Sequence, residues 1–336
     1  MDIKRLLVAT LFCTCLGAAS AADEPDVNYL PNIHGTVRAR WEMTTDDGES
    51  RFEVRNARLQ IDGKIASWID YFFNSDLCDQ GKMKVLDYWG RITPARGFTL
   101  RAGQFRMPFG VDPFRAPDKY FFSNRSYIGK QVCNIRGVGA EIGYTLPTTP
   151  LTVKVAAFNP GGIADHAQWH SSMAYAGKLT YRVGNVTLAT GVQSLLPQAV
   201  RINLLDGAAT WTCGRWTVEG EYMNKHYTHS AHKTCHAYNF FTAYTAPLRD
   251  CRFNQWSLEG RFDGMTDHSA GTSGNGSLLT TDDPARNRVT LGGTLSYIAG
   301  QRHLDLRLDY EHIFFRHDYK EANQGSRLVA ELILHF

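Results

Sequence analysis

Apolar and polar residues alternate along most of the chain, beginning at about residue 33. The pattern is plain at residues 304–311, which read LDLRLDYE, with every second position apolar and the positions between them charged. Comparable runs occupy residues 33–43, 173–183, 216–222 and 256–262. A β-strand with one apolar and one polar face produces this period of two. Because no segment after the N-terminus shows a comparable helical period, we predict an all-β protein.

The length of these runs favours a membrane barrel over a soluble sandwich. Strands of soluble sheets are about 5–6 residues long, whereas the first run extends from residue 33 to residue 43. Strands of about 9–11 residues, apolar toward lipid and polar toward a wet lumen, are typical of outer-membrane barrels. We therefore predict a transmembrane antiparallel β-barrel of about sixteen strands.

The connections between the runs alternate between short and long. The short connections are expected at residues 93–97, 145–150, 183–185, 213–215 and 299–301. The long connections are expected at residues 106–136, 159–172, 225–235, 264–287 and 315–326. Tight periplasmic turns and longer outer loops give an outer-membrane barrel this asymmetry. The connection between Thr245 and Asn254 is longer than the other predicted turns.

Both ends of the chain support export to a bacterial outer membrane. Lys4 and Arg5 precede an apolar segment at residues 6–16, and residues 19–21 read ASA, as in a secretory signal peptide. We predict a cleaved signal peptide at residues 1–21, a short periplasmic segment at 22–32 and a barrel at 33–336. The last run ends on Phe336, which resembles the insertion signal of bacterial outer-membrane barrels.

Composition excludes several other classes. Hydrophobic residues make up 43% of the chain and aromatic residues 12%, which is too apolar for a disordered chain. The net charge of +3 gives no field that would favour nucleic acid. The sequence contains no Gly-x-Ser-x-Gly elbow, no His-Glu-x-x-His pair and no phosphate loop. We therefore expect neither an enzyme nor a cofactor.

Three segments resemble the phosphate-selective porin O and P family. They are residues 52–63 (FEVRNARLQIDG), residues 101–110 (RAGQFRMPFG) with 122–126 (FSNRS), and residues 255–262 (QWSLEGRF). The resemblance implies a porin that passes small anions such as phosphate and assembles as a homotrimer in contact with the bilayer and lipopolysaccharide. The chain departs from the family at residues 55–58, which read RNAR instead of RRAR, and it lacks the family's Leu-Thr-Gly-Glu segment near residues 240–250.

The long connection at residues 106–136 is the candidate pore constriction. It contains only two acidic residues, Asp112 and Asp118, so its local charge balance is positive. Its basic residues are Arg106, Arg115, Lys119, Arg125, Lys130 and Arg136. If the loop folds into the lumen, these donors replace part of an anion's hydration, and arginine offers planar two-point contacts. The alternative is a solvated outer loop that binds lipopolysaccharide phosphates or nothing.

Basic residues on the barrel wall would add to the field in the lumen. The wall candidates are Arg38, Arg40, Arg55, Arg58, Arg91 and Arg101. Arg55 and Arg58 differ in parity, so only one of them faces the lumen unless the strand contains a bulge. Acidic residues lie among the candidates, and such mixtures favour pairing across neighbouring strands. We therefore expect a moderate preference for anions rather than strict selection of phosphate.

Histidines and a cysteine are concentrated in one predicted outer loop. The members are His226, His229, His232, Cys235 and His236. Their side chains suit zinc or copper, but a spacing of three fits neither a helix face nor a strand face. Ordinary loop residues are the favoured interpretation, and a metal site is the alternative.

Five cysteines remain after removal of the signal peptide: Cys78, Cys133, Cys213, Cys235 and Cys251. An odd number leaves at least one of them without an intramolecular partner. Cys213 and Cys251 fall at neighbouring turns, and Cys78 and Cys133 fall on the outer side. Two bridges, with Cys235 left over, are therefore our hypothesis for an oxidising compartment.

Two functions remain open at this point. The first is a porin that forms a water-filled channel for passive diffusion of small solutes, with a preference for anions. The second is a non-conducting outer-membrane adhesin or structural barrel that binds partners through its long loops.

Overall fold

The computed structural model describes residues 27–79, 81–133, 135–198, 200–249, 251–272, 279–315 and 325–336. The predicted signal peptide, residues 1–21, lies outside the described residues, as does the first part of the predicted periplasmic segment at 22–32. Within the described ranges, no helix is long and apolar enough to cross a bilayer.

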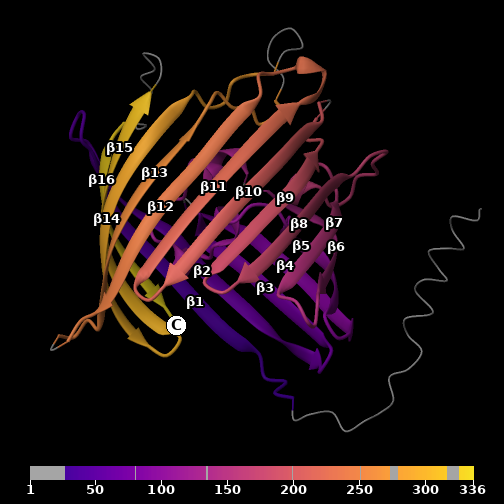
Figure 1. Ribbon diagram of the computed structural model, residues 1–336, viewed down its shortest axis with the longest axis horizontal. Helices are drawn as coiled ribbons and strands as arrows, with labels where there is room; N and C mark the ends of the chain where they lie inside the picture. The colour runs from indigo at the N-terminus through magenta and orange to yellow at the C-terminus, as the bar shows by residue number, and fades with distance from the viewer. Residues whose placement is uncertain are drawn as a thin grey trace, which may run out of the picture.

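The described chain forms one closed antiparallel barrel of sixteen strands, in which strands adjacent in sequence pair and β1 closes onto β16 (Figure 1). The first eight strands are β1 (Asn32–Thr44), β2 (Ser50–Ala66), β3 (Ile69–Asp79), β4 (Lys82–Ala95), β5 (Phe98–Arg106), β6 (Arg136–Thr145), β7 (Leu151–Phe158) and β8 (Ala174–Val183). The remaining strands are β9 (Val186–Leu195), β10 (Ile202–Cys213), β11 (Trp216–Tyr227), β12 (Cys235–Pro247), β13 (Gln255–Met265), β14 (Arg286–Ala299), β15 (Arg302–Phe315) and β16 (Arg327–His335). The predicted architecture and strand number are confirmed.

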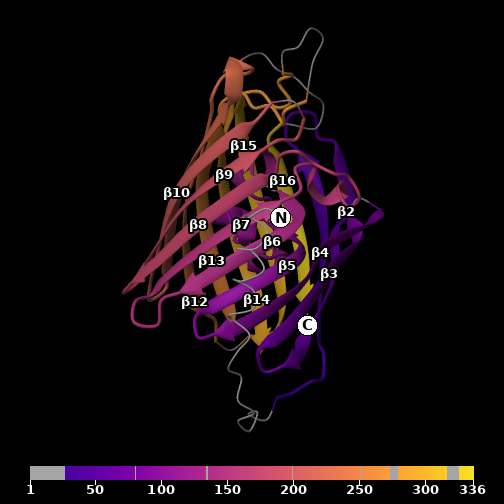
Figure 2. The same ribbon diagram turned by 90° about the vertical axis from the view of Figure 1, so that its right-hand side faces the viewer.

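The polar face of each strand points inward and the apolar face outward. In β15, Leu306 and Leu308 are 43% and 53% exposed, whereas Asp309 and Glu311 are 0% and 1% exposed. This is the reverse of a soluble protein, and it is the arrangement expected where the outer face meets lipid. Figure 2 shows the oblique strands of the wall from the side.

Turns and loops segregate to opposite ends of the barrel. One end, here called the turn end, carries two-residue turns in which Gly184, Gly214 and Gly300 adopt positive φ angles of 52°, 57° and 65°. Such tight hairpin turns require positive φ, which glycine adopts without a steric penalty. The same end contains Phe336, whose backbone pairs with Gly35 of β1. The opposite end, the loop end, carries the connection at 107–135 and the other long loops.

Candidate pore constriction

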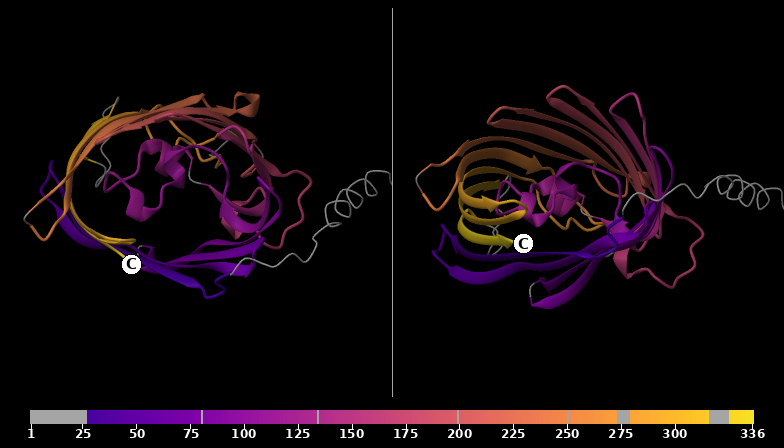
Figure 3. Two further views of the ribbon diagram at one scale, coloured as in Figure 1. Left: turned by 60° about the horizontal axis from the view of Figure 1, so that its bottom comes forward. Right: turned by 90° about the horizontal axis from the view of Figure 1, so that it is seen from below.

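The connection between β5 and β6 folds into the barrel instead of projecting from it (Figure 3). Residues 107–135, here called the lumen loop, contain two single 3-10 turns and one π-helical turn. These are η1 (Asp112–Phe114), η2 (Pro117–Lys119) and η3 (Ile128–Val132). The loop therefore narrows the lumen, as the first of the two interpretations of its sequence requires.

An apolar cluster fixes the lumen loop to one side of the barrel. The loop contributes Met107, Phe109, Tyr127, Ile128, Val132 and Cys133. The wall contributes lumen-facing apolar side chains that include Ala156, Phe158, Ala174, Ala176, Leu195, Ile202, Leu204, Met223 and Ala237. Burial of this much apolar surface stabilises the inward conformation and fills the lumen beside β7–β12.

Buried charges on the wall hold the backbone of the lumen loop. The Ser123 N–H donates to Asp309 Oδ2 at 2.6 Å, and the Tyr127 N–H donates to Asp263 Oδ2 at 2.9 Å. In the opposite sense, Arg38 Nη2 donates to the Ser123 carbonyl oxygen at 2.7 Å. Hydrogen bonds to charged groups contribute more than neutral ones. These three wall charges therefore anchor the loop.

A cavity of about 270 Å³ remains between the lumen loop and the side of the barrel formed by β1–β5. We call it the cationic cavity. Its basic lining residues are Arg38, Arg55, Arg58, Lys84, Arg106, Arg125, Lys130 and Arg136, and its acidic lining residues are Asp76 and Asp79. The lining therefore has an excess of six formal positive charges.

Bulges bring additional side chains into the cationic cavity. The register between β1 and β2 shifts between Arg38 and Ala39, so that Arg38 faces Asn56 and Ala39 faces Val54. The skipped residue is Arg55, and this bulge allows both Arg55 and Arg58 to line the cavity. A second shift, between Asn74 and Ser75, skips a residue of β4 in the same way.

Seven of the twelve sequence candidates line the cationic cavity, and the other five lie elsewhere. Arg115 of the loop pairs with Asp112 and Glu219, and Lys119 lies at the turn end of the lumen. Three wall candidates pair across strands: Arg40 with Glu53, Arg91 with Asp70, and Arg101 with Glu141. These pairs agree with the expected charge pairing across neighbouring strands.

Nine lining residues of the cavity were absent from the sequence candidates, and two of them, Lys84 and Tyr120, add to or contact its basic groups. Lys84 and Asp87 lie in β4 at an odd spacing, so strict alternation would put them on opposite faces of the strand. The bulge between them allows both side chains to face the lumen. Tyr120 carries no charge, yet its ring contacts two guanidinium groups, with Arg38 at 5.1 Å and Arg125 at 4.8 Å from its centroid. Such cation–π contacts orient both arginines. The one sequence signal for Tyr120 is that an aromatic residue stands among the basic residues of the segment 106–136.

Comparison with known proteins identifies the family. The model of the phosphate-selective porin O and P family matches residues 27–195, just over half of the chain. The chain belongs to this family. It is a porin of the bacterial outer membrane, and its family and fold are those of a channel. The turn end of the porin therefore faces the periplasm and the loop end faces the exterior.

Solved structures support the barrel fold at low sequence identity. The anion-selective porin from Comamonas acidovorans is 12% identical, with a TM-score of 0.62, over 91% of this chain and 99% of that one. The outer-membrane channel DcaP of Acinetobacter baumannii is 11% identical, with a TM-score of 0.63, over 94% and 100%. The trimer form of OmpT from Vibrio cholerae is 9% identical, with a TM-score of 0.59, over 91% and 99%. No curated protein sequence matches the porin.

The histidine-rich segment lies at the exterior end of the porin. Its imidazoles contact different partners: His226 bonds with Thr234, His232 with Thr281, and His236 with Tyr222, whereas His229 has a positive φ of 58°. Cys235 is buried against the Thr266 carbonyl. Across the described ranges, no three His, Cys, Asp or Glu side chains are arranged to hold a metal ion.

The hypothesis of two disulfide bridges is wrong. All five cysteines of the barrel are described, and all five are free. The lumen loop carries Cys133 into the apolar cluster beside Gln193 of β9, away from Cys78 on β3. Burial raises the pKa of the Cys133 thiol, which keeps it protonated and unreactive. Cys213 and Cys251 are exposed on separate turns.

Proposed function

We propose that the porin passes small anions, including phosphate, by passive diffusion past the cationic cavity. The observation that carries the proposal is the excess of six positive charges on a cavity of about 270 Å³. A small oxyanion that enters this space exchanges water for guanidinium and ammonium donors. The anion-selective character of the Comamonas acidovorans porin, a structural neighbour, agrees with it.

The charge pairing within the cavity sets the expected strength of the preference. Arg136 donates to both carboxylate oxygens of Asp87 at 2.9 and 3.0 Å, and Arg58 lies 3.4 Å from Asp76. Such pairs reduce the field that a passing ion experiences. We therefore propose a moderate anion preference rather than strict selection of phosphate.

The proposal includes the assembly and maturation of the porin. It takes residues 1–21 as a cleaved signal peptide, 22–32 as a periplasmic segment and 33–336 as the barrel. It also takes the working form as a homotrimer in contact with lipopolysaccharide, in line with the trimeric form of the Vibrio cholerae neighbour.

Conductance of the purified protein in planar bilayers tests the proposed function. Under a KCl gradient, we expect a reversal potential with the sign of chloride, and we expect added phosphate to reduce the current. A reversal potential with the sign of potassium would refute the anion preference and leave a porin. An absence of conductance from correctly folded protein would favour the alternative, an adhesin or structural barrel.

The anion preference is expected to weaken as the pH rises from about 7 to about 9. The Lys130 side chain contacts the water of the lumen but lies inside the barrel, away from bulk solvent. This loss of bulk hydration, together with the positive charges of Arg55 and Arg288, lowers the pKa of the Lys130 amine to about 8. The amine is therefore charged below about pH 8 and neutral above it. We expect the ratio of chloride to potassium permeability to fall about twofold.

The Lys130→Arg variant is the matched control for this pH dependence, because a guanidinium group stays charged throughout the range. The variant should keep its permeability ratio at the higher pH. An equal decline in Lys130→Arg would show that another group is responsible.

A further inference from the structure

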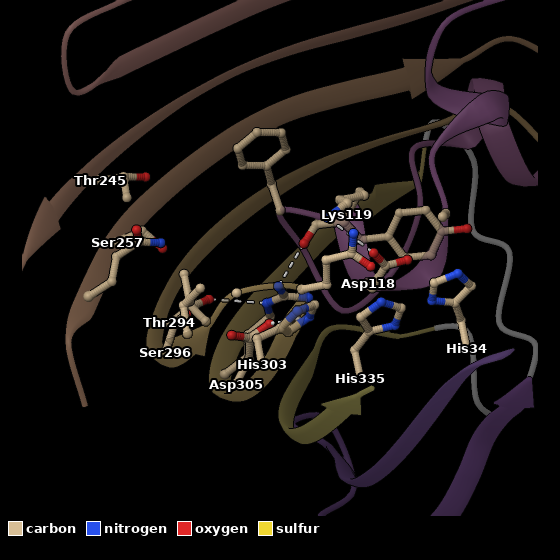
Figure 4. Close-up of a pocket in the computed structure, with 18 of the residues that line it drawn as sticks. His34, Asp118, Lys119, Thr245, Ser257, Thr294, Ser296, His303, Asp305 and His335 are labelled. Atoms are coloured by element: carbon tan, nitrogen blue, oxygen red, sulfur yellow. Dashed lines mark hydrogen bonds and ion pairs between the residues drawn. The ribbon is translucent and has the colours of Figure 1, made fainter. Parts of the chain in front are cut away.

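A second cavity lies in the lumen at the periplasmic end, next to the cationic cavity. Its volume is about 680 Å³, and its lining includes Gly300 and Gln301 of the turn between β14 and β15. Tyr120 lines both this space and the cationic cavity. We call this space the vestibule (Figure 4). An anion that passes the cationic cavity toward the periplasm meets the vestibule next.

Three histidines from neighbouring strands form a row in the vestibule. His34 of β1, His335 of β16 and His303 of β15 all point into it (Figure 4). The rings of His34 and His335 are 6.3 Å apart between centroids and parallel to within 2°. The rings of His303 and His335 are 5.0 Å apart with an interplanar angle of 27°. The antiparallel ladder explains this proximity, because His303 and His335 face each other across strands.

Each imidazole already has an oxygen neighbour. His34 Nε2 lies 3.3 Å from Asp62 Oδ1, and His303 Nε2 lies 3.6 Å from Asp305 Oδ2. His335 Nδ1 is 2.9 Å from the Thr36 hydroxyl oxygen. Carboxylate neighbours favour the protonated form of an imidazole, whereas a second imidazolium beside it opposes protonation.

The charged groups around the row have a small excess of negative charge. The vestibule is lined by the acidic residues Asp62, Asp118, Glu259 and Asp305 and by the basic residues Lys119 and Arg307. With neutral imidazoles and ionised carboxylates, the lining has a net charge of minus two. Protonation of His34, His303 and His335 changes that value to plus one. The sign of the field at the periplasmic exit therefore depends on the histidines.

We propose that the vestibule is a proton-dependent binding site for small oxyanions. The inference rests on the proposed anion passage and adds a second binding site along the same path. With neutral histidines, the negative vestibule disfavours an anion and does not hold it. With imidazolium groups, the vestibule holds the anion, since three new donors and a positive field replace a negative one.

Sulfate block of the chloride current at two pH values tests this site. Histidine titrates at about pH 6.5 in the absence of perturbation, so pH 7.5 and pH 5.5, on either side of about 6.5, separate its two states. Sulfate stays a dianion at both values, unlike phosphate. We expect the sulfate concentration that halves the current to be about fivefold lower at the acidic pH.

Variants test whether the three histidines, and not other titratable groups, cause the pH dependence of the sulfate block. The triple variant His34→Gln, His303→Gln and His335→Gln keeps hydrogen-bonding side chains but adds no charge, so its block should not depend on pH. If this variant does not insert, the double variant His34→Gln and His303→Gln should lose most of the dependence. His303→Lys places a permanent charge in the row, and at neutral pH it should bind sulfate more tightly than the unmodified porin does. All of these variants are made in a Glu259→Gln background, which removes a facing carboxyl group that also takes up protons. Lys119→Gln is the matched control, because it removes a facing charge but leaves the three imidazoles, so the pH dependence should remain.

The outcomes distinguish this inference from the proposed function. A pH dependence that survives in the triple variant would overturn the vestibule site. Anion-selective current with equal sulfate block at both pH values would also overturn it and leave the proposed function intact. Cation-selective current without sulfate block at either pH would overturn both.

Discussion

Replacement of Arg58 and Arg106 by glutamine is expected to remove most of the anion preference of the channel. Both side chains line the cationic cavity, and the Nε atom of Arg106 has no hydrogen-bond partner among the described residues. The double variant lowers the excess of positive charge in the cavity from six to four. We expect the ratio of chloride to potassium permeability, measured from the reversal potential, to fall about tenfold.

The same substitution leaves the wall of the barrel intact. After loss of Arg58, the Asp76 carboxylate still accepts from the Asn56 side chain at 2.6 Å and from the Ala57 N–H at 3.0 Å. Arg91→Gln is the matched control, because Arg91 lies on β4 outside the cavity and pairs with Asp70. A permeability ratio that falls equally in Arg91→Gln would show that total lumen charge, and not the cationic cavity, sets selectivity.

Substitution of Arg288 by methionine is expected to cause the largest loss of barrel stability. Arg288 pairs with Asp263 at 2.8 Å and Glu311 at 3.0 Å, and it donates to the Arg125 carbonyl oxygen at 2.7 Å. The side chains of the two acidic partners are 0% and 1% exposed. Without Arg288, longer ion pairs remain to these carboxylates: Arg261 lies 3.4 Å from Asp263 and 3.5 Å from Glu311, and Arg327 lies 3.8 Å from Glu311. Loss of the shortest partner of two buried charges is expected to cost about 3 kcal/mol. The measurement is the temperature at which the folded barrel converts to its unfolded form in detergent gels.

Two variants show whether the effect of Arg288→Met comes from buried charge. The double variant Arg288→Met and Glu311→Gln removes opposite charges together, so it should recover part of the loss. Arg51→Met removes an arginine whose side chain is 62% exposed and pairs with Glu42, and it should cost at most about 1 kcal/mol. A loss in Arg288→Met no larger than in Arg51→Met would contradict the anchoring role of Arg288.

A second result is expected when single-channel currents of Arg288→Met are recorded. Arg288 holds the backbone of the lumen loop at Arg125, a residue that lines the cationic cavity. Release of this contact should increase current noise, because the loop samples more positions. Quiet recordings with unchanged selectivity would show that the apolar cluster alone fixes the loop.

Much of the fold follows from local sequence patterns. A strand has a side-chain period of two, so residues 304–311 indicate which positions of β15 face lipid and which face the lumen. The number of strands follows because turn residues such as Gly184 and Gly214 mark short connections. The basic composition of residues 106–136 also identifies the candidate constriction without a structure.

Other properties depend on contacts between distant segments. The sequence does not indicate that the lumen loop folds inward, because the cluster that holds it joins Met107 and Ile128 to Leu204 and Met223. It also does not locate bulges, and the bulge at Arg55 decides that both Arg55 and Arg58 line the cavity.

Alternation thus determines the barrel and the two faces of its wall, since this pattern is local to each strand. Which charges neutralise one another, and which remain open to a solute, is decided only by the closed barrel. Arg115 and Lys130 belong to the same basic loop, yet Arg115 pairs with Glu219 of β11 whereas Lys130 lines the cationic cavity. Closure of β1 onto β16 brings His34, His303 and His335 into one row. The physical reason is that charge pairing depends on distance in space, which the tertiary structure sets for residues far apart in sequence.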